Sequence, residues 1–157
     1  MVHSSDLTTE MDDGSNTRRI RMIPFGFRLA GAANIVGVLF FSLAFTNERL
    51  IELSPAVMSR FGLISIMLWG LAYFSVASSY SAVPCLIGVF ALEKFIYVVS
   101  WLVWIQEHGQ ALSSLFTESP LTATFYTFYG PTDFIFGVFF AYVAMRDLRA
   151  KRKTEAT

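Results

Sequence analysis

Two adjacent charged residues, Glu93 and Lys94, are the side chains best placed to do chemistry. They lie in the middle of an apolar segment spanning residues 84–105. A segment of this length and composition predicts a helix that crosses a membrane. A charge at the centre of a bilayer costs about 2.5–3.5 kcal/mol on insertion scales. We therefore expect both side chains to face protein or trapped water and to have partners.

A third charge, Asp133, lies inside the last apolar segment. Neighbouring residues on a helix project in different directions, so Glu93 and Lys94 cannot pair with each other along one helix. We expect Lys94 to form an ion pair with Asp133. Glu93 then needs a separate donor, and three residues are available for this: Arg28, Asn34 and Tyr97. These six residues form the predicted ligand or proton site.

Aromatic side chains are abundant near these charges, particularly in the last apolar segment. Binding sites for small molecules are mostly apolar, with a few polar groups that fix the ligand. We expect an apolar pocket beside the charges, lined by Trp69, Tyr73, Trp101, Tyr129 and Phe136. Such a site favours the binding of an apolar or amphiphilic small molecule, or the transfer of a proton or ion.

Another interpretation of the charged residues stays open. In it the charges only hold the helices in register, since buried polar groups fix helix pairing in membranes. The protein would then be an accessory or assembly subunit of a larger membrane complex. Its docking surfaces would be two faces of small residues: Gly31, Asn34 and Gly37 on one helix, and Gly137, Ala141 and Ala144 on another.

Enzymatic chemistry has little support in the sequence. A possible acid, base and lysine nucleophile are present, but nucleotide-binding glycine motifs and the HExxH zinc motif are absent. The histidines, His3 and His108, both lie outside the apolar segments, which excludes a haem held by two membrane histidines. Cys85 is the only cysteine, which excludes an internal disulfide. We predict no cofactor and no metal.

Four apolar segments predict the elements that position these residues. The chain has 157 residues, of which 54% are hydrophobic, and this composition is typical of a membrane protein. The expected fold is an all-α, antiparallel four-helix bundle in the membrane, with spans at about 25–45, 61–79, 84–105 and 124–145. Pro24 is expected in the first turn of its helix and Pro55 at the start of the second. The fourth helix should be kinked at Pro131.

Basic residues predict the orientation of the chain. Nine Lys or Arg residues flank the side that carries both termini, and two, Arg49 and Arg60, flank the other side. Positive residues accumulate on the cytoplasmic side, so both termini should be cytoplasmic, in an inner (plasma) membrane. We expect a disordered tail at 1–22, a transmembrane domain at 23–149 and a basic tail at 150–157.

The expected partners follow from the same composition. They are the lipid bilayer, a small apolar ligand, and either further copies of the chain or another membrane subunit. Basic residues do not alternate with exposed aromatic ones, so a nucleic-acid partner has no support.

Overall fold

The computed structural model describes the backbone of residues 4–155 and the side chains of residues 22–155. Over that range all regular structure is helical, which agrees with the predicted all-α class. The elements are α1 (Ser4–Phe41), α2 (Glu48–Glu52), α3 (Arg60–Val76), η1 (Tyr80–Ala82), α4 (Pro84–His108), η2 (Gly109–Ala111), α5 (Leu112–Glu118) and α6 (Pro120–Glu155).

Three helical segments are long and apolar enough to cross a membrane. They are Met22–Phe41 within α1, Pro84–Glu118 and Pro120–Glu155. The fourth predicted span corresponds to α3, which is apolar but has only 17 residues. At 1.5 Å per residue it is about 25 Å long, whereas the hydrocarbon core is about 30 Å thick.

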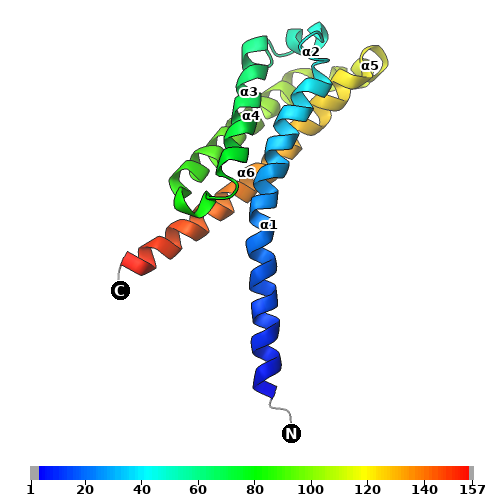
Figure 1. Ribbon diagram of the computed structural model, residues 1–157. Coiled ribbons are helices and arrows are strands. Elements are labelled where there is room, and N and C mark those ends of the chain that lie inside the picture. The colour runs from blue at the N-terminus through cyan, green and yellow to red at the C-terminus, as the bar shows by residue number, and fades with distance from the viewer. Residues whose placement is uncertain (1–3, 156–157) are drawn as a thin grey trace.

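Hydrogen bonds between distant parts of the sequence define the two ends of the molecule. At one end the Tyr126 hydroxyl donates to the Leu50 carbonyl over 2.9 Å, and Trp104 Nε1 donates to the Leu53 carbonyl over 3.0 Å. At the other end Lys151 Nζ donates to the Ala82 carbonyl over 3.0 Å. Successive long helices therefore run in opposite directions. The first long helix begins at the same end of the molecule at which the last long helix finishes (Figure 1).

The long helices pack chiefly as two pairs, α1 with α3 and α4 with α6. Small residues allow the first pair to approach closely. A Cβ atom on Gly31 would lie 2.7 Å from the backbone oxygen of Gly70, which is too close for any side chain. Close backbone approach through small residues is typical of helices that pack inside membranes. Gly31 therefore faces another helix of the same chain.

Two separate apolar clusters hold these pairs together, one toward each end. The terminal cluster, on the side of η1, contains Phe27, Tyr73, Phe90 and Phe140 among its fully buried members. The loop cluster, on the side of α2 and α5, contains Leu50, Met58, Leu63, Trp104 and Tyr126. The charged residues lie between the two clusters.

A strained turn follows α1. Leu43, Ala44 and Phe45 have φ angles of 49°, 52° and 72°, in the left-handed region that costs side-chain-bearing residues about 1–3 kcal/mol each. Asn47 compensates for this strain, because its Nδ2 atom donates to the Phe41 carbonyl over 2.8 Å and to Thr122 Oγ1 over 3.1 Å. The turn is thereby attached to the start of α6.

Several predicted boundaries differ from the structure at its N-terminal half. α1 begins at Ser4, within the segment predicted to be a disordered tail, and Pro24 lies inside this helix and not in its first turn. Each residue added to an existing helix forms one more hydrogen bond, so a span can extend a helix well beyond its apolar part. α3 begins at Arg60 and not near Pro55, because Ser59 Oγ caps it by accepting from the Gly62 amide over 3.1 Å.

The boundaries of the later helices agree better with the prediction. α4 begins at Pro84 and α6 begins at Pro120, each with proline where its missing amide hydrogen is not needed. α6 passes through Pro131 as one helix, as expected, and continues to Glu155. Residues 150–155 of the predicted basic tail are therefore helical.

Candidate functional site

Lys94 and Asp133 form an ion pair between α4 and α6, as predicted. Lys94 Nζ lies 2.6 Å from Asp133 Oδ1, and the two side chains are 1% and 15% exposed. Gly137, one turn along α6 from Asp133, makes room for this contact. A Cβ atom there would lie 3.3 Å from Lys94 Cβ. The pair therefore depends on close packing of α4 against α6.

Asn34 connects this ion pair to the other two long helices. Its Oδ1 atom accepts a hydrogen bond from Lys94 Nζ over 2.8 Å, and its Nδ2 atom donates to the Ile66 carbonyl of α3 over 3.0 Å. Asn34 was expected to serve Glu93, but its amide oxygen is bound to Lys94. A buried amide is costly unless both of its ends are satisfied, and here both are.

Glu93 takes its hydrogen bond from Tyr73 of α3, whose hydroxyl donates to Glu93 Oε2. Glu93 is only 6% exposed, and its Oε1 atom has no hydrogen-bond partner among the described residues. The predicted donor Arg28 is exposed and lies outside this group. Its long side chain reaches the surface because a buried guanidinium without its own partner would cost several kcal/mol.

Tyr97 contributes to the site through its ring. Lys94 Nζ lies 6.0 Å from the centre of the Tyr97 ring and 5.7 Å from that of Tyr73. A cation near the face of an aromatic ring is stabilised by about 0.5–2 kcal/mol, depending on its exposure to water. Tyr97 was expected to be a donor to Glu93, and the structure instead gives it a contact with Lys94.

Tyr73, which the sequence places in a pocket wall, is instead the hydrogen-bond donor to Glu93. Tyr73 is fully buried, and a buried tyrosine hydroxyl normally has a hydrogen-bond partner. One signal in the sequence could have indicated the contact. Tyr73 is the only tyrosine in the apolar part of α3, which packs against the other long helices.

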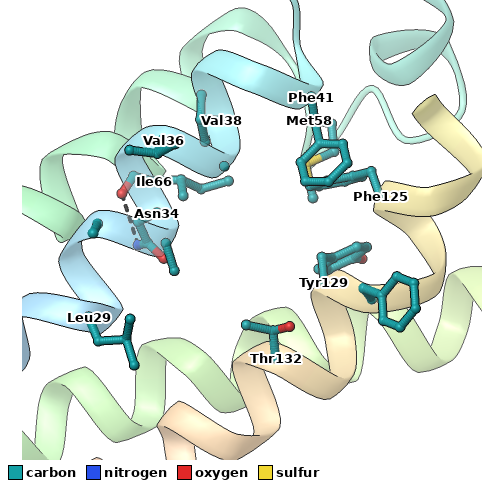
Figure 2. Close-up of a pocket in the computed structure, with 14 residues that line it drawn as sticks. Leu29, Asn34, Val36, Val38, Phe41, Met58, Ile66, Phe125, Tyr129 and Thr132 are labelled. Atoms are coloured by element: carbon teal, nitrogen blue, oxygen red, sulfur yellow. Dashed lines mark hydrogen bonds between the residues drawn. The ribbon is translucent and has the colours of Figure 1, made fainter. Parts of the chain in front are cut away.

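A groove of about 460 Å³ opens between α1 and α6 (Figure 2). It lies next to the charged residues, because Asn34 lines it and accepts a hydrogen bond from Lys94. One wall comes from α1, including Leu29, Asn34 and Val38, and the facing wall from α6, including Phe125, Tyr129 and Thr132. Met58 and Ile66 complete the lining near α3. We call this space the α1–α6 groove.

The lining of the groove differs from the prediction in four of five residues. Tyr129 lines it, as expected. Trp69 and Phe136 pack instead against the terminal cluster, and Tyr73 is a member of that cluster. Trp101 donates its Nε1 hydrogen to the Tyr126 carbonyl over 2.7 Å, between α4 and α6. These four aromatic side chains fill the contacts between helices, so the open space lies elsewhere.

The groove is almost entirely apolar. Its polar lining residues are Asn34, Tyr129 and Thr132. Both ends of the Asn34 amide are already bonded, and the Tyr129 hydroxyl oxygen is buried without a partner among the described residues. Lys94 and Asp133 offset each other's charge behind the Asn34 wall. The groove can therefore recognise an apolar shape, with few polar contacts.

The two small-residue faces proposed for partner docking are used within the chain. Gly31 packs against Gly70 and Phe74, and Gly137 packs against Phe95 and Lys94. Ala144 belongs to the terminal cluster. Neither face is available as a whole for another subunit. Across the described residues, no group of three or more His, Cys, Asp or Glu side chains is arranged to hold a metal.

Comparisons of the chain with protein-family models, with curated proteins and with solved structures gave no match. The function must therefore be inferred from the geometry of this site.

Proposed function

We propose that this protein binds an apolar or amphiphilic small molecule within the membrane, in the α1–α6 groove. The groove has the size and the apolar lining of a small-molecule site. Both of its walls belong to segments long and apolar enough to cross a bilayer, Met22–Phe41 and Pro120–Glu155. A ligand would enter from the lipid, which favours a molecule that partitions into membranes.

The observation that carries this proposal is the position of Asn34. Its side chain lines the groove and also accepts a hydrogen bond from Lys94. A ligand that presses on the Asn34 wall would alter the contact with Lys94 and, through it, the ion pair with Asp133. Binding in the groove would thus be linked to the buried charges, and this linkage explains why costly polar groups lie at this depth.

The proposal includes a membrane arrangement. All four long helices would cross an inner (plasma) membrane as an antiparallel bundle, with α3 reaching across by means of its flanking residues. Both termini would be cytoplasmic, in agreement with the excess of basic residues on their side. A bend of α6 at Pro131 would help to separate it from α1 and so open the groove.

The test is to fill the groove and measure retention of a ligand. Gly37 lines the groove and Gly88 lies on α4 away from it, and a Cβ at either position meets no atom within 4 Å. Gly37→Leu and Gly88→Leu are therefore matched variants. We expect native mass spectrometry to detect an apolar molecule on the wild-type protein and on Gly88→Leu, with a loss of at least tenfold on Gly37→Leu. Equal retention by both variants would contradict the proposal.

The same preparations separate ligand binding from a structural role. If Asn34→Leu lowers the yield of folded protein but the folded fraction retains the ligand as wild type does, the polar residues only support the fold. A second protein that co-purifies in stoichiometric amount would instead favour an accessory subunit.

A second candidate function, proton or ion transfer, is favoured by Glu93. This carboxyl group is buried, receives one hydrogen bond from Tyr73, and has an oxygen without a partner among the described residues. Proton transfer predicts that vesicles containing the protein acidify under an imposed potential and that Glu93→Gln abolishes this. If vesicles with the wild-type protein acidified no faster than vesicles without protein, or no faster than vesicles with Glu93→Gln, the function would be excluded.

A further inference from the structure

A second groove, unrelated to the α1–α6 groove, lies along the last turns of α6. It measures about 340 Å³ and is lined by Tyr142, Met145, Arg146, Arg149, Ala150 and Lys153. These residues are spaced three or four apart and so share one face of the helix. α6 extends here past η1 and the adjoining ends of α3 and α4 (Figure 1). We call this space the basic groove.

Arg146 is held in position at the edge of the basic groove. Its Nε and Nη2 atoms lie 2.7 and 2.6 Å from Asp147 Oδ1, and its guanidinium carbon lies 5.7 Å from the centre of the Tyr80 ring. The Arg146 side chain nevertheless remains 37% exposed. A guanidinium fixed in this way loses little conformational freedom when it binds a further acceptor.

The face of α6 that leads to this groove changes from apolar to basic within one turn. Ile135, Val138, Tyr142 and Met145 are exposed by 66%, 48%, 54% and 52%, at intervals of three or four residues. Arg149 follows four residues later and is exposed. An exposed apolar stripe that ends at guanidinium groups is complementary to a phospholipid along its length. The stripe can contact the acyl chain and the guanidinium groups can bind the phosphate.

We propose that the basic groove binds the headgroup of an anionic phospholipid, with an acyl chain lying along the stripe from Ile135 to Met145. Guanidinium groups match the geometry of phosphate and bind it through two parallel hydrogen bonds. Residues 146–155 contain five basic and two acidic side chains, a net charge of +3. That charge favours a lipid with a net negative charge over a zwitterionic one.

Arg149 and Arg152 provide the test, because both are exposed but only Arg149 lines the groove. The full-length protein in nanodiscs would be titrated with phosphatidylglycerol or phosphatidylcholine, and bound lipid counted by native mass spectrometry. We expect phosphatidylglycerol to be preferred. Arg149→Gln should weaken its binding about fivefold, from the roughly 1 kcal/mol that one basic residue contributes near a charged surface. Arg152→Gln should leave it within twofold of wild type.

Arg149→Lys, which keeps the charge but loses the paired hydrogen bonds, should fall between wild type and Arg149→Gln. An equal effect of Arg149→Gln and Arg152→Gln would overturn the proposal, because it would show a diffuse attraction to the membrane with no defined site. Equal binding of the two lipids would overturn it as well. The proposal does not depend on the function of the α1–α6 groove, which these variants leave intact.

Discussion

At the scale of single residues, the buried polar groups are satisfied unequally. Lys94 has two acceptors, Asp133 and Asn34, whereas Glu93 has one donor, Tyr73. Removing one partner of a buried ion pair is strongly destabilising because it leaves the other charge unpaired, whereas replacing both partners by apolar residues costs much less. The stability that a variant at this site loses should therefore depend on which partner is removed.

Lys94→Leu should lower the free energy of unfolding by about 3 kcal/mol or more, because it leaves Asp133 buried without its counter-charge. The double variant Lys94→Leu with Asp133→Leu should recover most of that loss. Unfolding in mixed micelles of increasing SDS content measures the free energy of unfolding of the single and the double variant. A double variant as unstable as the sum of the two single variants would show that the pair is not coupled.

Tyr73→Phe should destabilise the protein by about 1–3 kcal/mol, since it removes the hydrogen bond to Glu93 and leaves the whole carboxyl group buried without a donor. Tyr142→Phe is the matched control, because Tyr142 is 54% exposed. The same unfolding measurement should show a change below about 0.5 kcal/mol for the control. Similar losses in both variants would argue against the contact of Tyr73 with Glu93.

At this scale the ion pair between Lys94 and Asp133 was predictable, and the reason is electrostatic. Lys94 and Asp133 are ionisable residues within long apolar helices, and each needs an opposite charge, so few pairings are possible. Tyr73 was not predicted as the partner of Glu93, because a neutral hydroxyl does not need an opposite charge. Its contact depends on the rotation of α3 about its axis, which the apolar pattern of that helix leaves open.

At the scale of elements, small residues decide how closely helices approach. Trp101 packs against Gly130, where a Cβ atom would overlap the indole ring, and donates a hydrogen bond to α6. Gly88, on the same helix as Trp101, faces open space. The two glycines therefore have opposite effects on stability when they are replaced by a larger residue.

Gly130→Ala should destabilise the protein by about 1–3 kcal/mol, because the new methyl group displaces Trp101 from α6. Gly88→Ala should be neutral or stabilising by up to about 1 kcal/mol, since alanine favours helix more than glycine does. Thermal unfolding followed by circular dichroism measures both. If Gly130→Ala were as stable as Gly88→Ala, this result would contradict the close packing of Trp101 against α6.

The helix starts at Pro84 and Pro120 were predictable because proline and its flanking residues act locally. The start of α3 was not, since Ser54 and Ser59 are both suitable capping residues and the structure uses Ser59. The α1–α6 groove was placed beside the wrong aromatic residues for a different reason. Its position depends on how far α1 and α6 separate, which is a property of the assembled helices.

At the scale of the whole molecule, both termini and η1 lie at one end, and α2 and α5 lie at the other. A crossing of the membrane by all four long helices would put these two ends on opposite sides. Ser81 in η1 and Ser113 in α5 are both exposed and mark the two ends.

A membrane-impermeant maleimide should distinguish the two ends of the molecule when single cysteines are introduced at Ser81 or Ser113 in a Cys85→Ser background. We expect Ser81→Cys to react only after the cytoplasmic side is opened and Ser113→Cys to react in intact cells, because the basic residues favour cytoplasmic termini. Reaction of both positions from one side would contradict the four-span arrangement.

Because the apolar packing is divided into two separate clusters, we expect the two ends of the molecule to contribute independently to its stability. Phe27 and Leu50 are both fully buried, one in each cluster, with the polar residues in between. Truncations of these two side chains share no neighbour, so their penalties should simply add. If the α1–α6 groove binds a molecule as we propose, the polar layer could rearrange around it while both ends of the protein stay packed.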